Sequence, residues 1–113
     1  MTAAKYRRLA LSLPATVEAA HMGHPDFRVG GKIFATLGPD EDWAMVKLPP
    51  AEQAEFIAAE PAACRPAGGA WGRRGCTIIT LEHAKEAMVR HALISAWRNT
   101  APKHLVRELD LVD

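Results

Sequence analysis

Two histidines and an aspartate form the most polar cluster of the sequence, within His21-Met22-Gly23-His24-Pro25-Asp26. Imidazole nitrogens and carboxylate oxygens are ligands that zinc and iron take in proteins. The chain has no second Cys/His pair at the spacing of a zinc finger, and Cys64 and Cys76 do not form a C-x-x-C pair. We therefore expect no metal and no cofactor. The interpretation we favour is a turn whose imidazoles hydrogen-bond to backbone or carboxylate groups.

A second candidate for chemistry is a pair of arginines beside a tryptophan, in Trp71-Gly72-Arg73-Arg74-Gly75. Arginines at a loop tip can hold a phosphate with two parallel hydrogen bonds, and an aromatic ring nearby can stack on a base or on the guanidinium itself. In the alternative interpretation, Trp71 packs under the edge of a sheet and both arginines are solvated. The sequence leaves both interpretations open.

Candidate nucleophiles lack the surroundings that would activate them. Ser12 and Ser95 lie in predicted helices, outside any G-x-S-x-G turn. Cys76 begins a predicted strand in a region that should be buried, where a thiol is usually inert. The glycine-rich stretch 68–72 lacks the lysine and threonine of a phosphate-binding loop. We predict no catalytic residue and expect that the chain is not an enzyme.

The first half of the chain predicts one helix followed by strands. Apolar residues at helical spacing indicate a helix with one buried stripe, ended by Pro14: Tyr6, Leu9, Ala10 and Leu13. Residues 17–48 then favour β structure, with predicted strands at 17–22, 26–29, 32–37 and 43–48. Gly30-Gly31 suits a tight hairpin, because glycine adopts positive φ readily. Residues 43–48 alternate, with Trp43, Met45 and Lys47 on one face.

The second half predicts two longer helices around a strand. A helix at about 51–60, with Ala54, Ile57 and Ala58 as its inner stripe, precedes a loop at 61–75. A strand at 76–81 and a helix at 82–99 follow, and then a short basic helix at 103–109. Trp43 and Trp97 lie in regular elements and are interpreted as packing residues. The order α-β(3–4)-α-β(1–2)-α predicts an α+β fold, an antiparallel sheet covered on one face by helices.

Composition indicates one ordinary globular domain over residues 1–113. Hydrophobic residues make up 49% and charged residues 24% of the chain, and no apolar run approaches a membrane span. We read no leader peptide and expect two reduced thiols, a cytoplasmic location and no membrane partner. The net charge of +1 selects no partner. Acidic residues gather in 40–60 between two basic arms, which indicates either solvated faces or a basic face aimed at an anion.

Three separated segments resemble the MmcQ/YjbR family of small bacterial proteins. They are residues 21–35 (HMGHPDFRVGGKIFA), Trp71-Gly72-x-x-Gly75, and Ala96-Trp97-Arg98-x-x-Ala101-Pro102-Lys103, and residues 9–14 (LALSLP) also fit. The resemblance implies an α+β fold like that of the bacterial frataxin relative and of type III secretion chaperones, and DNA binding through a double-wing arrangement. It does not imply iron binding, because residues 2–13 hold none of the acidic side chains on which frataxin relies.

Two functional hypotheses follow from these observations. The first is weak, sequence-indifferent DNA binding, with five basic residues on phosphates: Arg28, Lys32, Arg73, Arg74 and Lys103. The alternative is a non-enzymatic module that uses the open sheet face to bind an unidentified protein or a small anion, with His24, Lys47 and Trp71 in its pocket. Contiguous positive charge on the wing tips and the last helix would favour DNA. A concave pocket around His24 and Lys47 would favour a ligand.

Overall fold

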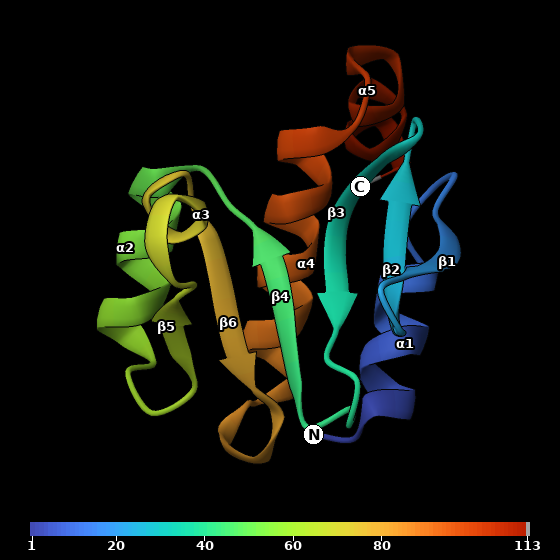
Figure 1. Cartoon of the computed structure of the whole chain (residues 1–113). Coiled ribbons are helices and arrows are strands. Elements are labelled where there is room, and N and C mark those ends of the chain that lie inside the picture. The colour runs from blue at the N-terminus through green and yellow to red at the C-terminus, as the bar shows by residue number, and fades with distance from the viewer. Residues whose placement is uncertain (113) are drawn as a thin grey trace.

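A computed structural model describes residues 1–112, which form an antiparallel sheet with helices packed mainly on one face (Figure 1). Six strands lie in the order β1-β2-β3-β4-β6-β5 across the described residues, and every neighbouring pair is antiparallel. Their bounds are β1 Val17–His21, β2 His24–Val29, β3 Lys32–Leu37, β4 Trp43–Lys47, β5 Cys64–Pro66 and β6 Cys76–Thr80. The predicted α+β fold with an antiparallel sheet is therefore confirmed.

The helices leave the other face of the sheet open. Helix α4 (Glu86–Thr100) packs across β3 and β4 with α1 (Ala3–Leu11) beside it, and α2 (Pro50–Ala59) packs on β5. The short α3 (Gly69–Arg73) contacts β6, and α5 (Lys103–Val112) follows α4. None of the helices within residues 1–112 is long and apolar enough to span a bilayer.

The hydrophobic core lies between the sheet and α1 and α4. In β4, Ala44 and Val46 are fully buried in this core, whereas the alternate residues Trp43, Met45 and Lys47 are half-buried on the other face. Helix α4 also buries one apolar stripe in this core, which includes Met88 and Leu93. That helix begins at Glu86 and not at 82, because residues 81–83 form a separate 3₁₀ turn.

Two sequence predictions in the second half are wrong. Segment 61–75 is not a loop throughout, since it contains the edge strand β5 and the helix α3. In α2, Ala54 and Ala58 are exposed and the buried residue is Gln53. The side-chain Nε2 of Gln53 donates to the carbonyl oxygens of Gly72 (3.0 Å) and Cys76 (3.1 Å), which ties α2 to α3 and β6.

The β2–β3 hairpin turns as predicted, and it meets the start of α5. Gly30 and Gly31 have φ values of 59° and 79°, a conformation that glycine adopts without the strain of a Cβ. A Cβ on Gly30 would press on the ring of Pro102, so the turn and the residue just before α5 are in contact. Lys103, the first residue of α5, therefore lies near this hairpin.

The two cysteines lie on opposite faces of the sheet and are both unpaired. The thiol of Cys64 contacts the sulfur of Met88 in α4 at 3.9 Å, on the covered face. Cys76 lines a cavity on the open face with Ile78, as the alternation of β6 predicts. A disulfide between them would have to pass through the sheet, so the predicted free thiols agree with the fold.

Candidate functional site

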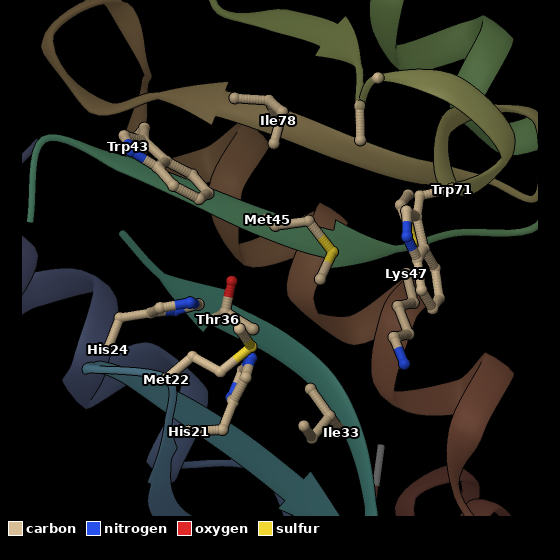
Figure 2. Close-up of a pocket in the computed structure, with 13 residues that line it drawn as sticks. His21, Met22, His24, Ile33, Thr36, Trp43, Met45, Lys47, Trp71 and Ile78 are labelled. Atoms are coloured by element: carbon tan, nitrogen blue, oxygen red, sulfur yellow. The ribbon is translucent and has the colours of Figure 1, made fainter. Parts of the chain in front are cut away.

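A cavity of about 450 Å³ occupies the open face of the sheet. Figure 2 shows side chains of the β1–β2 turn and β3 along one side of it, and side chains of β4 and β6 along the other. Thirteen residues line it: His21, Met22, His24, Ile33, Thr36, Trp43, Met45, Lys47, Ala67, Gly68, Trp71, Cys76 and Ile78. The three residues predicted for a ligand or partner pocket, His24, Lys47 and Trp71, are all among them.

The β1–β2 turn forms one wall of the cavity and holds a bulky residue in a strained conformation. His21 and His24 are paired across the strands, with ring centroids 4.4 Å apart, and Met22 and Gly23 make the turn between them. Met22 has a φ of 48°, which is rare for a residue with a Cβ, and its side chain is 92% exposed. The fold thus places a large apolar side chain in solvent at the rim of an apolar cavity.

Both histidines of the turn are held by hydrogen bonds through Nδ1. Nδ1 of His21 donates to the carboxylate of Asp26 (2.7 Å), and Nδ1 of His24 donates to the carbonyl oxygen of Leu37 (3.1 Å). These are the carboxylate and backbone partners that the sequence predicted for the imidazoles. Among the side chains that the structure describes, no group of three or more histidine, cysteine or acidic residues is arranged to hold a metal ion.

The buried Asp26 holds His21, a residue of the cavity wall, in position. Its side chain is fully buried, and it accepts hydrogen bonds from Nε and Nη2 of Arg28 at 2.7 Å and 3.0 Å as well as the one from His21. The Arg28 guanidinium, and then His21, lower the pKa of Asp26 against the opposing effect of burial. The carboxylate therefore stays charged and fixes the positions of both neighbours.

Strand β4 defines the long axis of the cavity. Trp43 and Lys47 are the first and last residues of the strand, so they are separated by about 13 Å at the usual rise of a strand. Figure 2 shows Trp43 toward one end, and Lys47 beside Trp71 toward the other. Trp43, interpreted from the sequence as a packing residue, packs against Gly38 but is only half-buried and borders the cavity instead of the core. Trp97 is fully buried, as predicted, and its indole N–H donates to the carbonyl oxygen of Pro14 at 3.0 Å.

Trp71 reaches the cavity from α3 and does not pack under the sheet edge. Its side chain is 61% exposed, which contradicts the interpretation that it is tucked away. The guanidinium carbon of Arg74 lies 5.9 Å from the centroid of the Trp71 ring, within the range of a cation–π contact. Arg73 and Arg74 are both exposed, as each interpretation of this segment expected.

The basic residues predicted to bind DNA lie toward one end of the sheet, but not all of them are free to contact a phosphate. Arg28 is bound to Asp26, whereas Lys32, Arg73, Arg74 and Lys103 are exposed. Lys32 begins β3, Arg74 lies just before β6, and Lys103 follows the contact between Pro102 and the hairpin. Figure 1 shows α3, α5 and the β2–β3 hairpin at the same end of the molecule.

Several cavity residues were missed by the sequence analysis, which named only three. The alternation in β4 already placed Met45 on the face of Trp43 and Lys47, so it was a usable signal for the floor of the cavity. The register then adds Thr36 and Ile78, the neighbours of Met45 on β3 and β6. That register is not readable from any one strand.

Comparison with known proteins identifies relatives of this fold. A family model described as YjbR matches residues 11–99. The crystal structure of Deinococcus radiodurans protein DR2400, which carries the family-model domain DUF419, aligns with a TM-score of 0.73 and 19% sequence identity. The alignment covers 85% of this chain and 75% of that one, and at this identity it shows the fold alone. No curated protein matches the chain.

Proposed function

The chain belongs to the YjbR family, and we propose that it is a non-enzymatic binding protein whose open sheet face takes a small ligand. The observation that carries the proposal is that His24, Lys47 and Trp71, which are far apart in the sequence, line one cavity of about 450 Å³. Pockets of roughly 300–1,000 Å³ with mainly apolar walls and a few polar groups are typical of small-molecule sites.

The walls of the cavity suit a largely apolar molecule. Met45 and Ile78 line its floor, and the exposed Met22 and Trp71 lie at its sides. Covering exposed apolar side chains with a ligand removes apolar area from water, which favours binding. One polar group would orient the ligand. Because the Leu37 carbonyl oxygen accepts the hydrogen bond from Nδ1–H of His24, a neutral His24 has Nε2 left as a hydrogen-bond acceptor for the ligand.

The reactive groups of the cavity favour binding over catalysis. Burial raises the pKa of the Cys76 thiol, and the nearby charges of Lys47 and Arg74 offset this only in part. A protonated thiol is a poor nucleophile. Within the part of the chain that the structure describes, neither Asp26 nor His21 forms a hydrogen bond with a hydroxyl or a thiol, so a non-enzymatic role is the simpler proposal.

Fluorescence titration with N-phenyl-1-naphthylamine, a neutral apolar dye, tests the proposal. We expect saturable binding to the wild type and a roughly fivefold to tenfold weaker affinity in Trp71→Ala, since that variant removes an exposed wall of the cavity. Lys85→Met is the control, because Lys85 is 79% exposed and does not line the cavity. A wild type that does not bind the dye would refute the proposal, and equal binding by Trp71→Ala would refute its location.

DNA binding is the second candidate, and the exposed cations at one end of the sheet favour it. Lys32, Arg73, Arg74 and Lys103 could contact phosphates, whereas Arg28 is occupied by Asp26. The net charge of +1 provides little long-range attraction, so we expect weak binding. A small footprint predicts that log affinity falls with log salt with a slope of roughly 2–4. Contacts to phosphates alone predict little dependence on DNA sequence.

An anisotropy titration at low salt, with duplexes of unrelated sequence, tests this candidate. The double variant Arg73→Glu with Arg74→Glu should weaken binding to all duplexes by a similar factor. Lys85→Glu, at a position away from this end of the sheet, is the control. If the wild type binds no duplex, or if the double variant binds as well as the wild type, these arginines are not a DNA site.

A further inference from the structure

A second hollow adjoins the apolar cavity at Lys47. It has a volume of about 460 Å³ and also shares Ile33 with the first cavity. Its other lining residues are Arg28, Gly31, Lys32, Asn99 and Thr100. Three cationic side chains and two polar ones therefore surround this hollow, and no carboxylate among the described residues lines it.

Two of the three cations of the hollow, Lys32 and Lys47, are available to bind an anion. The charge of Arg28 is offset by Asp26, and the two hydrogen bonds between them hold the guanidinium in place. Lys32 and Lys47 make no ion pair with any residue that the structure describes. The hollow therefore carries a net positive charge of two lysines, which an anion would neutralise.

Lys47 connects the two spaces because its side chain borders both. Figure 2 shows the side chain of Lys47 extending past Trp71, with its ammonium group pointing away from Met45 and Ile78. A lysine can pack its methylene chain on an apolar surface while the ammonium stays among polar groups. The backbone at this point is also fixed, since Nδ2 of Asn99 donates to the carbonyl oxygen of Lys47 at 3.1 Å.

From this arrangement we infer that the ligand is an amphipathic anion, with its apolar body on the sheet between Trp43 and Lys47 and its acidic head in the hollow between Lys32 and Lys47. This inference rests on the proposed ligand-binding function and adds the chemical class of the ligand. The apolar cavity alone would select no head group. The adjoining cations favour a carboxylate or a phosphate over a neutral polar group, because charged hydrogen bonds are the stronger ones.

Competition against the bound dye tests the inference with a matched set of probes. Decanol, decanoate and decyl phosphate share a ten-carbon chain, of a length comparable to the distance from Trp43 to Lys47, and differ only in the head group. The two anions are titrated below their critical micelle concentrations, and decanol below its solubility limit, into the protein–dye complex. We expect both anions to displace the dye at roughly tenfold lower concentration than decanol, and the comparison between them separates a preference for phosphate from one for carboxylate.

Two variants locate the head group. Lys32→Gln removes a charge that borders only the hollow, so it should bind the dye and decanol as the wild type does. Lys47→Met keeps most of the length of the side chain but also borders the apolar cavity, so its anion preference is measured within the variant, as the ratio of the decanol and anion concentrations that displace the dye. Each should also lose most of the preference for the anions, whereas Lys85→Met should keep it. High salt should reduce the same preference.

The outcomes separate the two proposals. If the dye does not bind the wild type, the ligand-binding function fails and the inference fails with it. If the dye binds and decanol displaces it as well as the anions do, the cavity is a ligand site but the ligand is not an anion. If the anion preference survives in both lysine variants, the head group lies elsewhere and the assignment of the hollow is wrong.

Discussion

Asp26→Asn should destabilise the fold and loosen the cavity wall at the same time. The carboxylate of Asp26 is fully buried, and it accepts hydrogen bonds from Arg28 and His21. Asparagine has nearly the same shape, but it carries no charge and keeps only one oxygen acceptor. Its NH₂ group would face N–H donors of Arg28 or His21. At least one donor would therefore lose its partner.

The expected loss of stability in Asp26→Asn lies between the cost of breaking a buried ion pair and the cost of breaking an exposed one. Breaking a fully buried pair costs about 3–5 kcal/mol, whereas an exposed pair contributes about 0–1 kcal/mol. Here the acid is buried, but the side chains of Arg28 and His21 are 34% and 33% exposed, so water can hydrate the groups left behind. We therefore expect Asp26→Asn to lower the free energy of unfolding by about 1–3 kcal/mol at pH 7.

This effect should depend on pH in a defined direction. Because the pKa of Asp26 is lower in the folded protein than its ordinary value, the unfolded state takes up the proton first as the pH falls. The stabilisation is fully present above the ordinary aspartate pKa of about 4. It is lost as the pH falls through the lower pKa of the folded state. The difference between wild type and Asp26→Asn should therefore shrink in acid.

Urea unfolding, followed by far-UV circular dichroism at pH 7 and at several acid pH values, measures both predictions. Glu18→Gln is the matched control, because Glu18 forms a partly exposed ion pair with Arg7 and should contribute less than about 1 kcal/mol. The dye affinity of Asp26→Asn should also fall, since His21 lines the cavity. A loss below about 0.5 kcal/mol at pH 7, or the same loss at every pH, would contradict the role given to this carboxylate.

Three further predictions concern the fold. Leu93→Ala should lower the free energy of unfolding by about 2–5 kcal/mol in urea titrations, because Leu93 is buried between α4 and the sheet. Gly75→Ala should cost more than Gly31→Ala in the same assay: both glycines have positive φ, but a Cβ on Gly75 would overlap the carbonyl oxygen of Leu48, whereas one on Gly31 meets open space. Cys64 and Cys76 should react slowly with a thiol reagent in the native protein at neutral pH, because burial raises the pKa of both, and two thiols per chain should react in denaturant. Equal costs for the two glycines, or fast thiol reaction in the native state, would count against the packing described.

Local patterns predicted most of the secondary structure because they arise within single elements. The period-two alternation of residues 43–48 identified β4 and separated its core side from the side of Met45. The Gly30-Gly31 pair identified the hairpin, and both glycines have the positive φ that its turn requires. These signals depend only on backbone geometry and on one buried face, so neighbouring residues are enough to reveal them.

The errors lie where a long-range contact overrides the local pattern. Ala54 and Ala58 fit an inner helical stripe, yet Gln53 is buried because Gly72 and Cys76 supply acceptors for its amide. Those acceptors are about twenty residues away. Residues 64–66 form a strand only because they pair with β6, in a segment whose glycines and prolines are typical of loops. No local property of either segment carries this information.

The sequence by itself determined the fold class, the turn with its hydrogen-bonded histidines, and the alternation that leaves one sheet face free. Only the tertiary structure decided that His24, Lys47 and Trp71 border one cavity, and that Lys32 and Lys47 border one hollow. Each of these residues belongs to a different element, and their distances depend on the lateral order of β2, β3, β4 and β6. That order is set by packing of the whole core against α4, which joins residues too distant along the chain for any local pattern to relate.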